Sequence, residues 1–139
     1  MINADVLLEG PDLFYMAGYW DGHSDMPAAN HITETWDEIA QRVNAEHGIN
    51  LLAFPQGAFG PSDQLAFTYH FHTAMFLAGM NTIPGWYDMN IMYAIFDMAT
   101  ILHTYRDDFH YISQAWPGKI EANMRGFSIF LEELLLADY

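Results

Sequence analysis

Three side chains with metal-ligand chemistry occur at helical spacing in the second half of the chain. His103, Asp107 and His110 are separated by four and three residues, which would place all three on one face of a helix. Imidazole and carboxylate groups suit zinc or ferrous iron with open coordination positions. Because three ligands from one helix leave a metal poorly enclosed, a fourth ligand such as His70 or His72 would have to face them.

The same spacing also fits the solvated side of an amphipathic helix, and we favour that interpretation. Arg106 and Gln114 share the face of the three candidate ligands, whereas the opposite face carries Ile, Leu, Phe and Tyr side chains. A metal-binding bundle or metal-assisted enzyme that uses His103, Asp107 and His110 is therefore an alternative hypothesis. The favoured interpretation expects no metal and no other cofactor.

Motifs for other kinds of catalysis are missing from the sequence. There is no cysteine, which excludes a thiolate nucleophile, a thiolate zinc site and a disulfide framework. No serine lies in a Gly-x-Ser-x-Gly elbow, and the glycine-containing loop at 56–61 has no lysine for a phosphate. The sequence therefore favours a protein without enzymatic activity.

The strongest signal in the sequence is its excess of negative charge. Among 139 residues there are 18 acidic and four basic ones, so the net charge is −14 at pH 7. With so few cations the carboxylates cannot be neutralised by ion pairs, and the negative potential extends over a long range. Such a protein is not expected to bind nucleic acid or an anionic membrane surface directly. It fits a basic protein surface.

A candidate binding face can be assembled from acidic residues in the first third of the chain. The predicted acidic face comprises Asp12, Asp21, Asp25, Glu34, Asp37 and Glu38. The last three occupy one predicted helical turn, and the first three precede it in a helix and loop that would lie beside it in a helical hairpin. The alternative is a solvated surface that keeps an apolar chain in solution.

The partner suggested by this face is the basic groove of a nucleic-acid-handling protein. The composition is similar to that of small acidic proteins with which phages block restriction or CRISPR enzymes, a resemblance of class and not of family. Spread evenly, the charge would amount to roughly one per 500 Å² of surface, which is sparser than that of DNA, so mimicry of nucleic acid requires clustered carboxylates. A third interpretation is a subunit of a homo-oligomer, because the nine Met and the four Trp, eight Tyr and ten Phe suggest apolar surface left for a partner.

Hydrophobic spacing predicts a mostly α protein, a compact bundle of five to six helices in one globular domain over residues 1–139. The predicted helices run from Pro11 to Gly22, from Thr35 to Gly48, from Ser62 or Asp63 to about Met80, from Asp88 to Gln114, either unbroken or broken at an Asp107 or Asp108 cap, and from Ile120 to Leu135. One short extended segment is expected near residues 49–54.

Two of these helices are predicted to form the centre of the bundle. The helix that ends at Met80 is apolar nearly all round and should be the central one. The last helix should pack on it with one stripe, made of Ile120, Met124, Phe127, Leu131, Leu134 and Leu135. The uncharged segment 64–87 contains His, Thr, Asn and Pro without flanking bases, so burial is favoured over a membrane span. The N-terminus lacks a basic, apolar leader, and we expect a cytoplasmic protein.

Overall fold

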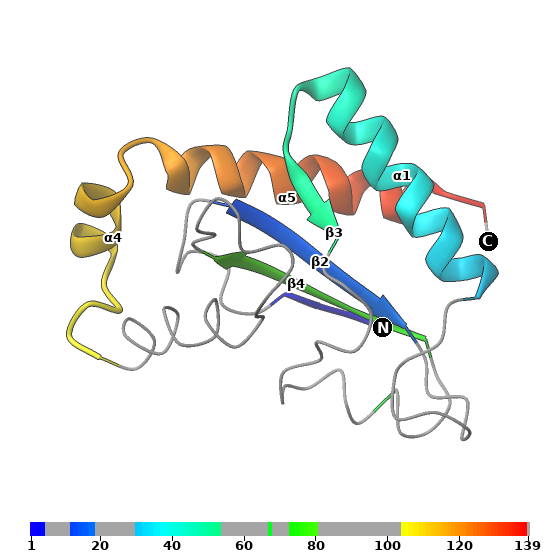
Figure 1. Cartoon of the computed structure of the whole chain (residues 1–139), viewed down its shortest axis with the longest axis horizontal. Helices are drawn as coiled ribbons and strands as arrows, with labels where there is room; N and C mark the ends of the chain where they lie inside the picture. The colour runs from blue at the N-terminus through cyan, green and yellow to red at the C-terminus, as the bar shows by residue number, and fades with distance from the viewer. Residues whose placement is uncertain (5–11, 19–29, 54–66, 68–72, 81–103, 139) are drawn as a thin grey trace, which may run out of the picture.

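The structure is a computed structural model, and it describes residues 1–4, 12–18, 30–53, 67, 73–80 and 104–138. In these residues the chain forms four strands, β1 (Ile2–Ala4), β2 (Asp12–Gly18), β3 (Leu51–Ala53) and β4 (Ala74–Met80), and three helices, α1 (His31–His47), α4 (Phe109–Ala115) and α5 (Lys119–Leu136). This is an α/β fold (Figure 1). The predicted all-helical bundle of five to six helices is therefore wrong.

The four strands form one mixed sheet in the order β1-β4-β2-β3. Strand β2 is antiparallel to β4 and parallel to β3, and β1 is parallel to β4. Parallel neighbours need a crossover connection, and α1 lies in the connection between β2 and β3. Helices α1 and α5 lie on the same side of the sheet and pack against each other (Figure 1).

Residues 12–18 form strand β2, where the sequence predicted a helix. Leu13, Phe14, Tyr15 and Met16 are all buried, because β2 is a central strand with a covered surface on both sides of the sheet. A strand buried on both faces has a continuous apolar run in place of alternation. Such a short run cannot be distinguished from a buried helix by its periodicity, and this is the physical reason for the wrong prediction.

The central apolar helix predicted to end at Met80 is wrong over its last seven residues. Residues Ala74–Met80 form strand β4 between β1 and β2. Met75 and Leu77, which face the helices, and Ala74 and Ala78, on the other side, are all fully buried. The segment was correctly predicted to be central and apolar. Its secondary structure was not, and residues 62–66 and 68–72 lie outside the described residues.

Helix α1 confirms the second predicted helix, although it begins earlier than expected. Its N-cap is Asn30, whose side-chain oxygen accepts from the backbone N–H groups of Ile32 and Thr33, while Thr33 Oγ1 accepts from the Asn30 N–H. This reciprocal capping box replaces the one expected at Thr35. The helix ends at Gly48 as predicted, and Gly48 has the left-handed φ of 64° that favours glycine.

Strand β3 confirms the extended segment expected after α1. Asn44, near the end of α1, fixes its start: Asn44 Nδ2 donates to the Leu51 carbonyl, and the Leu51 N–H donates to Asn44 Oδ1. The Asn44 side chain thus satisfies two backbone groups at the start of β3. Without it, these groups would need hydrogen bonds from water.

Helix α4 confirms the alternative in which Asp107 or Asp108 caps a helix, whereas residues 88–103 of the helix expected before it lie outside the described residues. The backbone turns at Thr104–Asp108, and Asp108 caps α4 by accepting from the His110 N–H at 2.6 Å. Pro117 and Gly118 separate α4 from α5, with Gly118 at φ 75°. Among the described residues, no helix combines the length and the apolar character needed to cross a membrane.

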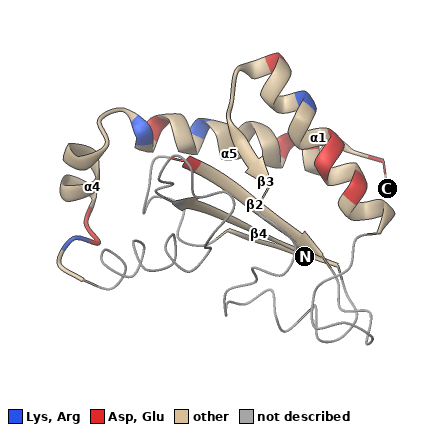
Figure 2. Cartoon of the chain, in the orientation of Figure 1, with Lys and Arg blue, Asp and Glu red and all other residues tan. Residues whose placement is uncertain are grey.

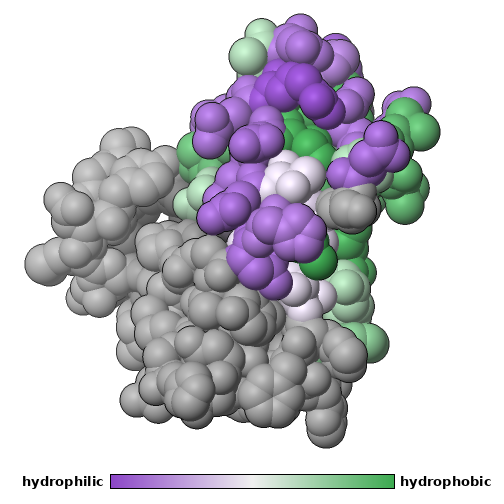
Figure 3. Space-filling model, turned by 90° about the vertical axis from the view of Figure 1, so that its right-hand side faces the viewer, coloured by the Kyte–Doolittle hydropathy of each residue, from purple (hydrophilic) through white to green (hydrophobic). Residues whose placement is uncertain are grey.

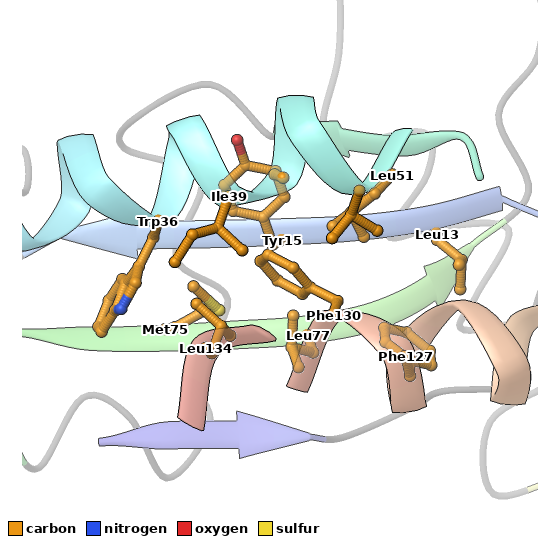
Figure 4. Packing of buried hydrophobic residues seen from close by; sticks show 12 residues of the cluster. Leu13, Tyr15, Trp36, Ile39, Leu51, Met75, Leu77, Phe127, Phe130 and Leu134 are labelled. Atoms are coloured by element: carbon orange, nitrogen blue, oxygen red, sulfur yellow. The ribbon is translucent and has the colours of Figure 1, made fainter. Parts of the chain in front are cut away.

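The hydrophobic core lies between the sheet and the two helices α1 and α5 (Figure 4). Its buried members are Leu13, Tyr15, Trp36, Ile39, Ala40, Val43, Leu51, Met75, Leu77, Phe127, Phe130 and Leu134. The predicted stripe of α5 is shifted around the helix, because Asn123, Gly126 and Phe130 are buried while Met124 and Leu135 are exposed.

Gly126 allows α5 to approach the sheet closely. A Cβ atom at this position would overlap Leu13 Cδ1 of β2 and lie 3.2 Å from Ile49 Cγ2. Glycine inside a helix is unfavourable by about 1 kcal/mol relative to alanine, so its presence here is explained by the space that a side chain would need.

We expect Gly126→Val to destabilise the fold. Valine would displace the buried side chain of Leu13, and overpacking of a core generally costs about 1–3 kcal/mol. The matched control is Ala122→Val on the exposed side of α5, which introduces the same β-branched residue into the same helix. Urea unfolding should show a lower midpoint for Gly126→Val than for the control, and equal midpoints would contradict the close approach.

Candidate functional site

Three acidic residues lie together on the outer side of the first turns of α1. Glu34, Asp37 and Glu38 are all exposed, whereas the neighbouring Trp36 and Ile39 face the core. The cap at Asn30 fixes the start of the helix and thereby its rotation. We call Glu34, Asp37 and Glu38 the α1 acidic surface (Figure 2).

One of these carboxylates is held in place from inside the core. The hydroxyl of Tyr15 points toward α1 (Figure 4) and donates to Asp37 Oδ1 at 2.7 Å. Burial raises the pKa of Tyr15 far above its usual value, and the hydrogen bond to Asp37 and its negative charge raise it further. Tyr15 therefore stays protonated and remains a donor, and Asp37 receives a fixed orientation at the surface.

The single cation of α1 is directed away from this surface. Arg42 follows Glu38 by four residues, a spacing that favours a pair along one helix. In the structure Arg42 Nη2 instead lies 2.6 Å from Glu133 Oε2 and joins α1 to α5. The bridge is exposed and is expected to add little stability. As a result, the arginine of α1 pairs with a residue of α5 and not with the α1 acidic surface.

The three other basic residues of the chain lie toward the far end of the molecule. Lys119 and Arg125 belong to the first half of α5, and Arg106 lies in the turn before α4 (Figure 2). The Arg106 guanidinium carbon is 5.5 Å from the centre of the Tyr105 ring and 5.8 Å from that of Tyr111. These three basic residues are thus separated from the α1 acidic surface.

Figure 3 shows the molecule from the right-hand side of Figure 1, where α1 lies. Hydrophilic residues cover the upper part of the view, and hydrophobic residues appear along its right-hand edge. Large apolar side chains that are exposed include Leu135 and Leu136 of α5.

The predicted acidic face is only partly assembled. Asp12 is the first residue of β2, whereas α1 begins near the other end of that strand, where Asn30 Nδ2 donates to Thr73 Oγ1 at 2.8 Å. A strand of seven residues is about 20 Å long, so Asp12 lies apart from the α1 acidic surface. The hairpin of two helices that would have joined them is wrong because its first helix is β2. Asp21 and Asp25 lie outside the described residues.

The alternative metal site of His103, Asp107 and His110 lies only partly within the described residues. His103 lies outside the described residues, Asp107 lies in the turn before α4, and His110 is in the first turn of α4. The helix begins only at Phe109, so Asp107 and His110 do not share one helical face. His110 Nε2 lies 2.8 Å from Gln114 Nε2. In the described part of the chain, no group of three or more His, Cys, Asp or Glu side chains is arranged to hold a metal.

Comparison with known proteins does not assign this geometry to a family. No family model, curated protein or solved structure matches the chain. The function is therefore argued from the α1 acidic surface and its surroundings.

The sequence analysis missed two contacts of this site. Tyr15 and Asp37 are 22 residues apart, and Arg42 and Glu133 are 91 apart. No local spacing signals such contacts. The Tyr15 contact would have required recognising β2 as a strand whose alternate residues face α1.

Proposed function

We propose that this protein is a non-enzymatic binding protein that docks the α1 acidic surface on the basic nucleic-acid-binding surface of another protein. The observation that carries the proposal is the cluster of Glu34, Asp37 and Glu38 on one exposed turn of α1, while the only arginine of that helix is tied to α5. We expect the two proteins to meet in the cytoplasm.

The local charge density of this surface supports a partner that binds nucleic acid. Residues 34–38 occupy about 7.5 Å of the helix axis, so their three carboxylates give about one charge per 2.5 Å of axis. Duplex DNA carries one per ~1.7 Å. The carboxylates are thus clustered over one turn, which supports mimicry of nucleic acid there, although the average charge of the whole surface is much sparser. A groove that contacts phosphates with Lys and Arg would meet similar spacing here.

The fixed orientation of Asp37 supports the same proposal. A carboxylate can accept several hydrogen bonds, and Tyr15 holds Asp37 Oδ1 from the core side. A positioned carboxylate loses less side-chain entropy on binding than a freely rotating one, which favours affinity.

We expect neutralisation of the α1 acidic surface to weaken partner binding. In the variant Glu34→Gln/Asp37→Asn/Glu38→Gln, the amide at residue 37 can still accept the Tyr15 hydrogen bond. Each exposed ion pair contributes about 0.2–1 kcal/mol, so the loss of three weakens binding by roughly 3- to 140-fold. The measurement is the affinity of a partner captured from lysate, determined at several salt concentrations.

The control variant Glu46→Gln/Glu121→Gln/Asp138→Asn has the same net charge but leaves the α1 acidic surface intact; all three positions are exposed. It should bind as the wild type does. The captured partner should also release its nucleic acid when the wild-type protein is added. Equal weakening by both variants would show that overall charge acts rather than this surface, and binding that is unchanged at high salt would contradict a charge-based contact.

A further inference from the structure

Helix α5 carries a second apolar stripe beside the face that packs on the core. Met124 is 45% exposed and Leu135 is 79% exposed, and between them lie the exposed Ser128 and the half-buried Leu131. We call Met124, Ser128, Leu131 and Leu135 the outer α5 stripe. Phe127, Phe130 and Leu134 point into the core, and Leu131 packs against its edge. Met124, Ser128 and Leu135 are exposed, so the outer stripe borders the core face.

The outer α5 stripe has the spacing of a helix-pairing seam. Its members follow one another at intervals of four, three and four residues, the pattern with which two helices interlock side chains along a shared seam. Helix α1 does not occupy this seam, because it packs on the other flank of α5, where Glu133 meets Arg42. Ser128 is small enough to allow a close helix crossing.

Two charged residues beside the seam indicate what covers it. Arg125 and Glu132 are exposed and directly follow Met124 and Leu131 in the sequence, so both lie on the same flank of the seam. They are seven residues apart, about 10.5 Å along the axis, and cannot pair with each other within one helix. In an antiparallel pair of identical helices, positions on this flank face each other.

We propose that α5 pairs antiparallel with α5 of a second copy of this chain. Met124 of one copy then packs against Leu135 of the other, and Ser128 packs against Leu131. Arg125 of each copy faces Glu132 of the other, and the two-fold axis repeats every contact. A parallel pair would place the two Arg125 side chains at one level and the two Glu132 side chains at another.

The pairing leaves the α1 acidic surface uncovered, so this inference does not depend on the proposed function. The seam covers 11 residue steps, about 16 Å, so the contact between the two helices is short. We therefore expect a dimer that dissociates on dilution. Dimerisation should be measured at about 0.15 M salt. At this ionic strength the repulsion between two acidic chains is screened beyond about 8 Å, whereas close ion pairs persist.

The apolar contact is tested with two neighbouring leucines. Leu135 is in the seam, whereas Leu136 is 73% exposed and lies about 100° further around the helix, outside the seam. Sedimentation equilibrium of the full chain should show a concentration-dependent dimer for the wild type and for Leu136→Glu, and a monomer for Leu135→Glu. Circular dichroism should show all three proteins folded.

The charge pair tests the antiparallel arrangement. Arg125→Glu and Glu132→Arg should each weaken dimerisation about tenfold, because each places like charges opposite each other twice. The double variant Arg125→Glu/Glu132→Arg should restore it. A wild-type chain that stays monomeric at millimolar concentration, equal effects of Leu135→Glu and Leu136→Glu, or a double variant no stronger than the single ones would each overturn the proposal. Loss of folding in Leu135→Glu would also overturn it, since another part of the chain would then cover the stripe.

Discussion

Replacing Leu134 with aspartate is expected to unfold the protein at neutral pH. Leu134 is 1% exposed and lies at the end of α5 beside Met75 of the sheet (Figure 4). An aspartate here would have to bury an unpaired carboxylate or release the last turns of α5 from the sheet. Either change costs several kcal/mol, compared with about 5–15 kcal/mol for the total stability of a protein.

The next residue in the chain supplies the control. Leu135 has the same side chain and the same helical environment but is 79% exposed, so Leu135→Asp should stay folded. Near-ultraviolet circular dichroism and urea unfolding distinguish the two outcomes, since only a packed core gives a cooperative transition. If both variants remain equally stable, α5 does not pack on the sheet in the orientation of the structure.

The elements that were predicted correctly from the sequence are those with one solvent-exposed face. In α1, Trp36, Ile39, Ala40 and Val43 recur at helical spacing, polar residues lie between them, and Gly48 ends the run. Both the apolar period and the stop signal are local, so they can be read without knowing the rest of the fold. The cap at Asp108 and the extended segment at β3 are local signals of the same kind.

The strands β2 and β4 could not be recognised because their surroundings, not their own pattern, decide their structure. Each is apolar on both faces, and helices were the simpler interpretation of uncharged runs. The partners of β4 are distant in the sequence: Met75 pairs with Ile2, and Leu77 pairs with Tyr15. Tertiary context of this kind overrides local propensity.

The candidate site was likewise predicted correctly only where its residues are close together in the sequence. Glu34, Asp37 and Glu38 are neighbours in one helix, so their clustering followed from the predicted helix. The position of Asp12 depends on how β2 enters the sheet, and the predicted helical hairpin placed it at the wrong end of the molecule. The contact between Tyr15 and Asp37 depends on both the strand and the helix, which no single segment of sequence reveals.

That contact leads to the second large effect, which concerns alkaline pH. Tyr15 is 4% exposed, and burial, the hydrogen bond to Asp37 and the charge of Asp37 all raise its pKa in the folded state. In the unfolded chain a tyrosine ionises near pH 10. Between pH ~10 and the higher pKa of Tyr15 in the folded protein, the unfolded state loses a proton that the folded state keeps. The free energy of unfolding therefore decreases as the pH rises.

The contribution of Tyr15 is fully present below pH ~10 and is lost as the pH increases above it, by about 1.4 kcal/mol per pH unit. Urea unfolding from neutral to strongly alkaline pH measures this slope. In Tyr15→Phe the slope should be smaller by about that amount. At neutral pH the same variant should lose about 1.5 kcal/mol, at the low end for a hydrogen bond to a charged group, because water can solvate the exposed Asp37.

Two further variants separate the causes of this behaviour. Asp37→Asn keeps an acceptor for the Tyr15 hydroxyl but removes the charge, and since burial is the largest cause of the raised pKa, most of the alkaline slope should persist. Tyr105→Phe removes a phenol that is 81% exposed and should leave the stability at neutral pH unchanged. If Tyr15→Phe has the same alkaline slope as the wild type, the Tyr15 hydroxyl is not buried against α1, and the fixed orientation of Asp37, on which the proposed docking surface relies, is lost with it.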